Sequence, residues 1–273
     1  MFRMWIETSL GTIHWLLYWL SGRRGSKDVR SSGRQACLNV GSAYQAPEGW
    51  VNLDRSIHVL IESLPFLPAI LHGLKILNNE QYGKYRDGRW SRVRFWDVRY
   101  SLPFPDNTFD YIYSSHLLEH LAQGVVGHLL RECYRVLKPG GVLRLVVPDL
   151  YKAASEYVDT VRRLERADIN DSETVAFLGE PVKVGNLTDR FVREILVDPD
   201  PIRQLVFGHA WMYDAWSLAL RLRNLGFESV ARKEYRRGSV PDLDLLDCRP
   251  LNSLHLESIK PSTRGLSTLG GRS

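Results

Sequence analysis

Short apolar runs alternate with segments of helical spacing from residue 36 onward. Five of the runs have the length of a buried strand, and they span residues 36–40, 50–54, 92–97, 109–114 and 142–147. Longer segments repeat apolar residues at every third or fourth position, at residues 116–137, 150–166 and 215–225. Strands that alternate with helices are typical of a mainly parallel sheet that is covered by helices on both faces. The pattern therefore predicts an α/β fold with a doubly wound, mostly parallel sheet.

Two more apolar runs follow the last of these helices, near residues 227–235 and 253–259. Little helical pattern separates them, so we expect an antiparallel pair of strands at one edge of the sheet. The Pro-Gly-Gly segment at 139–141 follows the long helical pattern and is predicted to end that helix.

Residues 36–260 are predicted to form the main domain, between an N-terminal arm with a linker (1–35) and a tail (261–273). The tail is rich in Ser, Thr and Gly and is expected to be flexible. Within the domain, residues 57–90 are predicted to form a helical insertion or lid. Prolines and a glycine interrupt its apolar stretch, which argues against a membrane-spanning helix.

Charge is concentrated in the arm. The chain of 273 residues has a net charge of +5, and six basic against two acidic residues place most of this excess in residues 1–36. The rest of the chain is close to neutral, and a duplex-binding domain needs a basic face on its folded body. Nucleic acid is therefore not an expected partner.

Three tryptophans and a tyrosine lie beside the basic flank of the arm, within residues 5–24. This combination suits a helix that lies in a membrane interface, which would make the protein peripherally membrane-associated. The same helix could instead pack on the domain or form a homodimer. A secretion signal is less favoured, because Arg3 is the only charge in its first residues and no small-residue cleavage site follows.

The overall composition is that of an ordinary globular protein, with 44% hydrophobic and 25% charged residues. The three cysteines are far apart in sequence and form no Cys-x-x-Cys pair. Reduced, structural thiols are the simplest interpretation, and they indicate a cytoplasmic protein.

Small and acidic residues follow the predicted strands at the positions where ligands bind in doubly wound sheets. Asp54 and Asp97 suit a ligand with ribose hydroxyls and a base amino group, while Gly41 lets the backbone approach such a ligand closely. A dinucleotide is disfavoured, because the Gly-x-Gly-x-x-Gly loop that cradles a pyrophosphate is absent.

The sequence resembles class I S-adenosylmethionine-dependent methyltransferases of the methyltransferase type 11 family. The resemblance is firm over roughly residues 36–150 and weaker at 209–214 and 225–227. Its segments are Leu38-Asn39-Val40-Gly41-Ser42, Gly49-Trp50-Val51-Asn52-Leu53-Asp54, Asp97-Val98, Leu102-Pro103-Phe104-Pro105-Asp106-Asn107-Thr108-Phe109-Asp110, Ser114-Ser115-His116-Leu117-Leu118-Glu119-His120-Leu121 and Arg135-Val136-Leu137-Lys138-Pro139-Gly140-Gly141-Val142-Leu143.

This resemblance implies a seven-stranded, Rossmann-like sheet with S-adenosyl-L-methionine lying over the first strand ends. The residues it implies for cofactor binding are Gly41 and Ser42 beside the methionine part, Asp54 at the ribose, Asp97 with the Val98 backbone at the adenine, and Ser114 and Ser115 closing the methionine side. The implied activity is methyl transfer to a small-molecule, glycan or lipid-linked acceptor; the choice of a glycan or lipid rests on the arm and the apolar insertion.

One departure from the family pattern favours an alternative. Ala43 stands where the glycine-rich loop of the family usually has a second glycine. If this position has a positive φ, alanine costs about 1 kcal/mol of strain. A catalytically degenerate adenosyl-binding or scaffold protein is the alternative function.

Histidines are the candidate proton acceptors for an acceptor that starts protonated. His116 is the first candidate, and His209 belongs to a second polar cluster. Residues 116–120 also spell His-x-x-Glu-His, an inverted zinc-peptidase signature. That signature requires an active-site helix and a further ligand downstream, whereas this segment directly follows a strand, so no metal is expected.

Overall fold

The computed structural model describes residues 18, 35–64, 66–166, 209–250 and 252–262. The predicted membrane-contacting segment of the arm, apart from Tyr18, and the tail beyond residue 262 lie outside the described residues. Within the described part of the chain, no helix combines the length and the apolar character that a membrane span requires.

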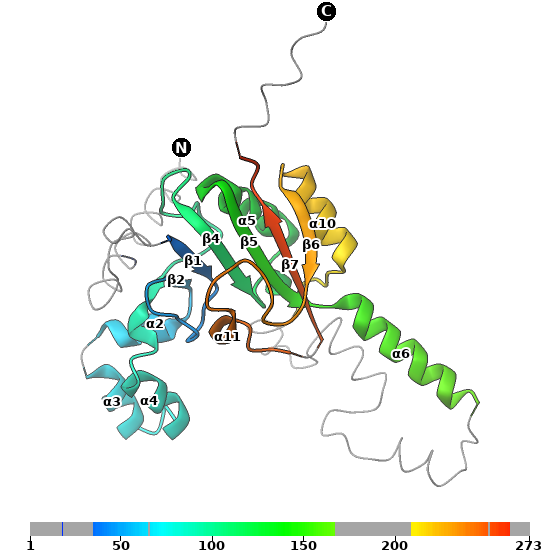
Figure 1. The fold of residues 1–273 in the computed structure, drawn as a ribbon. Helices are drawn as coiled ribbons and strands as arrows, with labels where there is room; N and C mark the ends of the chain where they lie inside the picture. The colour runs from blue at the N-terminus through cyan, green and yellow to red at the C-terminus, as the bar shows by residue number, and fades with distance from the viewer. Residues whose placement is uncertain (1–17, 19–34, 65, 167–208, 251, 263–273) are drawn as a thin grey trace, which may run out of the picture.

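Seven strands form one sheet in the order β3-β2-β1-β4-β5-β7-β6 (Figure 1). Strands β1 to β5 run parallel, and β7 is antiparallel to both β5 and β6. The bounds are β1 (Cys37–Val40), β2 (Val51–Asp54), β3 (Val93–Phe95), β4 (Phe109–Ser115), β5 (Leu137–Pro148), β6 (Glu228–Lys233) and β7 (Ser253–Ile259). This confirms the doubly wound, mostly parallel α/β sheet and the antiparallel pairing at one edge.

Helices α5 and α10 pack on one face of the sheet, and a short helix α11 belongs to the segment that covers the other (Figure 1). Helices α2, α3 and α4 lie beside the β3 edge, where the predicted insertion begins. The bounds are α2 (Ile57–Ser63), α3 (Leu67–Gly73), α4 (Asn79–Arg86), α5 (Gln123–Val136), α6 (Leu150–Leu164), α10 (Ala215–Asn224) and α11 (Leu243–Leu246), with 3₁₀ turns η2 (Trp90–Arg92) and η3 (Leu118–His120).

The alternation of side chains along β5 divides the core. Leu143 and Leu145 belong to the apolar cluster under α5 and α10, whereas Val142 and Val146 belong to the cluster that includes α11. Arg144 shares the second face because it lies two residues from each of these valines. Each face of the sheet is therefore buried, as the apolar runs predict.

The chain between β4 and α5 differs from the sequence prediction. A helix is expected from residue 116, but His116 has φ +49° and only a 3₁₀ turn follows before α5 begins at Gln123. His116 donates its backbone N–H to Val146 O (2.8 Å), which extends the β4–β5 pairing by one residue. This hydrogen bond keeps the chain in the sheet and delays the helix.

Helix α5 ends at Val136, just before the Pro-Gly-Gly segment as predicted, but this segment lies inside strand β5, which begins at Leu137. Gly140 N–H donates to Lys260 O, and Lys260 N–H donates to Gly141 O (2.8 and 3.0 Å). A side chain at Gly141 would lie 2.9 Å from Asp110 O. The glycines thus allow the start of β5 to approach its neighbours on both sides.

Tyr18 is the described residue of the segment 5–24, and it packs on the main domain. Its ring lies edge-on to those of Trp96 (5.7 Å between centroids) and Phe104 (6.3 Å). Arg94 Nη1 donates to its hydroxyl (2.6 Å). At this position the arm contacts the domain.

Candidate cofactor and acceptor site

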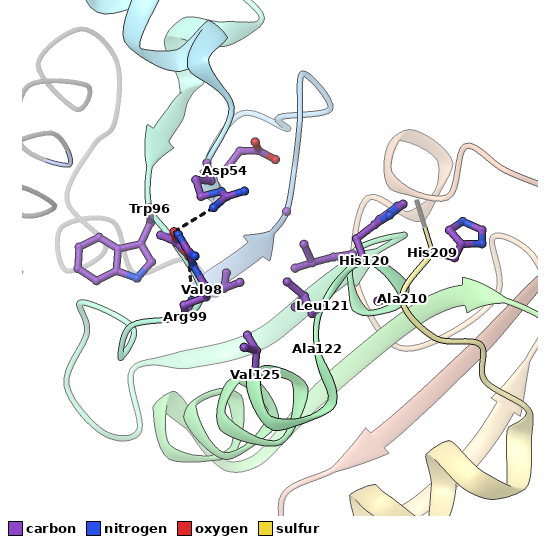
Figure 2. A pocket seen from close by; sticks show the side chains of 14 residues that line it. Asp54, Trp96, Val98, Arg99, His120, Leu121, Ala122, Val125, His209 and Ala210 are labelled. Atoms are coloured by element: carbon purple, nitrogen blue, oxygen red, sulfur yellow. Dashed lines mark hydrogen bonds and ion pairs between the residues drawn. The ribbon is translucent and has the colours of Figure 1, made fainter. Parts of the chain in front are cut away.

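A cavity of about 460 Å³ opens at the carboxyl ends of β1, β2 and β3 (Figure 2). It is lined by Gly41, Asp54, Arg55, Trp96, Asp97, Val98, Arg99, Leu117, His120, Leu121, Ala122, Val125, His209 and Ala210. Figure 2 shows Asp54, Trp96 and Arg99 toward one end and His120 with His209 toward the other. We refer to these as the strand end and the histidine end of the cavity.

Gly41 ends β1 in a conformation that excludes a side chain. Its φ is +73°, and a Cβ atom there would lie 2.9 Å from Leu117 Cδ2. Its N–H donates to Leu53 O (2.8 Å), which ties the loop to β2. The backbone of this loop can therefore approach a ligand closely.

Asp54 is held by the loops that flank it. Its Oδ2 accepts from Ala43 N–H (2.8 Å) and its Oδ1 accepts from Ser56 N–H (2.7 Å). Burial raises the pKa of Asp54 above its ordinary value, and the two backbone hydrogen bonds oppose this shift without cancelling it. Each oxygen retains a lone pair that can accept a further hydrogen bond.

Asp97, which follows the neighbouring strand β3, has the opposite electrostatic environment. Burial alone would raise its pKa, but the hydrogen bonds and charge of Arg99, helped by Arg55, hold the pKa of Asp97 below its ordinary value. Arg99 Nη2 lies 2.5 Å and Arg55 Nη1 3.4 Å from Oδ2, while Arg99 N–H donates to Oδ1 (3.0 Å). This carboxylate is ionised and surrounded by donors.

Ala43 has φ +45°, so the conformational cost expected from the sequence applies. Alanine is strained by about 1 kcal/mol at such an angle relative to glycine. Its N–H nevertheless makes the hydrogen bond to Asp54 described above. The loop therefore contacts Asp54 through this backbone donor with alanine at the position.

The structure brings only part of the predicted set to the cavity wall. Gly41, Asp54, Asp97, Val98 and His209 line it. The other lining residues were not predicted as site residues, and they are Arg55, Trp96, Arg99, Leu117, His120, Leu121, Ala122, Val125 and Ala210. Arg55 directly follows Asp54, and Arg99 comes two residues after Asp97. An aspartate at a strand end with an arginine one or two residues later is therefore the signal that could have pointed to them.

The other predicted residues lie behind or beside the cavity. Ser42 and Ser114 are buried, and the N–H of Ser42 is already bonded to Leu53 O (3.0 Å). Ser115 is half-buried at the end of β4. His116 directs Nδ1 toward Glu119 Oε1 (3.0 Å) and Nε2 toward Ser253 Oγ (3.1 Å), away from the lining residues.

The histidine end is built from two distant segments of the chain. Glu119 O accepts hydrogen bonds from Ala210 N–H (2.6 Å) and Trp211 N–H (3.1 Å). These bonds fix His209 beside His120, with 5.2 Å between ring centroids.

Part of the chain that forms this site matches a known protein family. The family described as "Methyltransferase domain" matches residues 80–145, from α4 through β3, β4 and α5 into β5. Residues 80–145 of the chain therefore match a methyltransferase domain. This domain implies S-adenosylmethionine as its cofactor, as the resemblance predicted.

Curated relatives of the methyltransferase domain are similar over part of their length. The ubiquinone/menaquinone biosynthesis C-methyltransferase UbiE of Pasteurella multocida is 31% identical over 105 residues, which cover 36% of this chain and 38% of that protein. UbiE of Dinoroseobacter shibae is 30% identical over 128 residues, covering 43% and 50%. The chain thus spans half or less of the length of these relatives.

Solved structures are similar at a more distant level. A possible histamine N-methyltransferase from Thermotoga maritima has a TM-score of 0.41 at 13% identity, covering 94% of this chain and 97% of that one. A SAM-dependent methyltransferase from Archaeoglobus fulgidus has a TM-score of 0.42 at 15% identity, covering 84% and 87%. The fold of the methyltransferase domain rests on its own strand order instead.

Proposed function

We propose that the protein transfers the methyl group of S-adenosylmethionine to a small-molecule acceptor. One observation carries this proposal: a single cavity joins the ends of β1, β2 and β3 to a cluster of imidazoles. Ligands of doubly wound sheets bind at such strand ends. A donor site and an acceptor site would therefore share one cavity.

The residues at the strand end fit the cofactor. Asp54 has lone pairs left for two ribose hydroxyls, and Gly41 supplies a backbone surface without a side chain. Ser42, Ser114 and Ser115 stay predictions for the methionine side, with Leu117 as the side chain that lines the cavity there.

The adenine end fits with one rearrangement. Asp97 already receives donors from Arg99 and Arg55 on both oxygens, and a carboxylate offers about four lone-pair positions. The contact with Arg55 is the longest, and the Arg55 side chain is 61% exposed. A base amino group would replace this arginine, while the backbone of Val98 would remain beside the base.

The bound sulfonium supplies an activated methyl group for in-line displacement. The protein must therefore align the acceptor, exclude water and, for a hydroxyl or phenol, accept a proton. Apolar side chains of Trp96, Leu117, Leu121 and Val125 help to exclude water. His209 lines the histidine end and is placed to accept the proton. His116 is not among the lining residues and contacts Glu119, so its effect on the cavity is indirect.

The acceptor class is inferred from the cavity and from the relatives. The UbiE relatives are named for ubiquinone and menaquinone biosynthesis, which favours a small acceptor with apolar character. A glycan or lipid-linked acceptor is a narrower form of the proposal that depends on membrane contact by residues 5–24. The alternative is a catalytically degenerate adenosyl-binding protein, and the backbone strain at Ala43 is the observation that supports it. This alternative predicts that the protein binds the cofactor without transferring its methyl group.

Cofactor binding is tested first, by the thermal stability of the full-length protein with and without S-adenosylmethionine. A ligand at one hundred times its Kd stabilises the folded state by about 2.7 kcal/mol. Asp54→Asn should remove most of this ligand-induced shift, because the amide is a poorer acceptor for the ribose hydroxyls. Asp87→Asn, an exposed carboxylate in the loop after α4, is the matched control and should keep the full shift.

The pH dependence adds a second readout. The shift should weaken as pH falls through the pKa of Asp54, which lies above the ordinary value, because the ribose hydroxyls require the carboxylate. Without ligand the sign reverses: a raised folded-state pKa makes the Asp54 contribution to stability less favourable as pH rises through it. No stabilisation at millimolar cofactor would contradict the proposal. Binding without labelled methyl transfer to pooled small-molecule extracts would favour the degenerate alternative.

A further inference from the structure

A buried carboxylate without a hydrogen-bond partner lies behind the histidine end of the cavity. Glu119 is fully buried, and neither of its carboxylate oxygens accepts an aligned hydrogen bond among the described residues. His116 Nδ1 is 3.0 Å from its Oε1, which is ion-pair distance without hydrogen-bond alignment. A buried carboxylate is strongly unfavourable unless a proton or a cation compensates for its lost hydration.

Two more imidazoles converge on the same carboxylate. His120 Nε2 lies 3.9 Å from Glu119 Oε1, and the potential ligand atoms of Glu119, His120 and His209 all lie within 4.8 Å of one another. The backbone hydrogen bond from Ala210 N–H to Glu119 O fixes the distant segment in this place. The convergence is therefore part of the fold.

We propose that Glu119, His120 and His209 bind a divalent metal ion, with Zn²⁺ as the best match to these donors. Two imidazole nitrogens and one carboxylate oxygen form the ligand set of zinc sites that keep an open position. Mg²⁺ and Ca²⁺ prefer oxygen ligands throughout. In a tetrahedral site with bonds of about 2.0–2.1 Å the ligand atoms lie about 3.3 Å apart, so side-chain rotations must close the present separations.

The environment of Glu119 supplies the outer contacts that such sites use. His116 bridges between Glu119 Oε1 and Ser253 Oγ, at 3.0 and 3.1 Å. If the Ser253 hydroxyl donates to Nε2, the imidazole proton is on Nδ1 and faces the carboxylate. Outer contacts of this kind orient metal-binding carboxylates. His116 is thus a positioning residue for the ion.

The open coordination position would face the cavity. His120 and His209 both line it, and Figure 2 shows them at the end away from Asp54. An ion there would offer a positive charge to an oxygen atom of the acceptor. Metal binding itself does not depend on methyl transfer, so this proposal and the proposed function can fail separately.

The test is calorimetric titration of the metal-stripped, full-length protein with Zn²⁺. We expect one ion per chain, and we expect Glu119→Gln and His209→Ala each to abolish this one-to-one binding. His116→Asn should weaken it by about 10–100-fold, as outer contacts do. His72→Ala, which removes an imidazole in α3 far along the chain, is the control and should bind as the parent protein does.

Two outcomes would overturn the site. Either the parent protein binds no Zn²⁺ stoichiometrically, or Glu119→Gln and His209→Ala bind it unchanged. Circular dichroism and the S-adenosylmethionine-induced thermal shift are measured on the same variants. If His209→Ala does not fold, His209→Gln replaces it; retained folding and cofactor binding with lost Zn²⁺ binding is the expected result.

Discussion

Two buried clusters of charge lie at different places on the sheet and differ in how they are satisfied. Around Arg144, every carboxylate has a partner: Arg144 pairs with Asp247 (2.5 Å) and Glu257 (3.0 Å), and all three side chains are nearly inaccessible. Around Glu119, three imidazoles approach a carboxylate that accepts no aligned hydrogen bond among the described residues. The first cluster is closed, and the second is incomplete beside a cavity.

The difference separates a structural role from a functional one. Arg144 also donates to the backbone oxygens of Glu234 and Arg237, and Tyr113 Oη donates to Asp247. These bonds fasten the segment before α11 to the sheet. Fully satisfied buried networks make a fold rigid, whereas unsatisfied buried groups are expected where a ligand completes them.

The largest expected effect comes from breaking the closed cluster. Arg144→Met leaves Asp247 and Glu257 buried without their cation, so we expect the free energy of unfolding to fall by about 3–5 kcal/mol. Urea denaturation measures it, and Arg223→Met, an exposed arginine near the end of α10, is the matched control. A loss below about 1 kcal/mol would show that the cluster does not carry the stability assigned to it.

A smaller effect tests how tightly the closed cluster is packed. A Cβ atom at Gly238 would overlap Glu257 Oε1 and lie 2.8 Å from Arg144 Nη1. Gly238→Ala should therefore cost about 1–3 kcal/mol, as overpacking does. The matched control is Gly83→Ala in α4, where a Cβ atom has no neighbour within 4 Å. Equal stability of the two variants in urea would mean that the side chains of the cluster rearrange around the added methyl group at little cost in free energy.

The smallest effect is expected at the incomplete cluster. Glu119→Gln removes a buried charge while preserving shape, so the metal-free protein should change in stability by less than about 1 kcal/mol in either direction. The same urea titration, in the presence of a chelator, measures it. A loss as large as that of Arg144→Met would place Glu119 among the structural charges and remove the contrast between the clusters.

The sequence predicted the sheet well, because β1, β2, β4 and β7 are short segments that are rich in apolar residues. It also placed Gly41, Asp54 and Asp97 correctly at the carboxyl ends of the strands, because the carboxyl ends of parallel strands lie on the same side of the sheet. Both predictions rest on the local pattern of apolar and polar residues.

What the sequence did not predict depends on contacts between distant residues. The approach of His209 to Glu119 rests on a backbone hydrogen bond to Ala210, and no local pattern encodes that bond. For the same reason the local sequence does not identify His209 as a further ligand for the His-x-x-Glu-His segment. The partners of Arg144 and the early turn at His116 are likewise set by tertiary pairing, which overrides helical spacing.

The contact between Tyr18 and Trp96 links the arm to the wall of the cavity. Trp96 lines that cavity on one side and receives the edge of the Tyr18 ring on another. Thermodynamic coupling is reciprocal. If ligand binding depends on the position of Trp96, displacing Tyr18 weakens that binding, and a bound ligand favours the Tyr18 contact by the same coupling free energy.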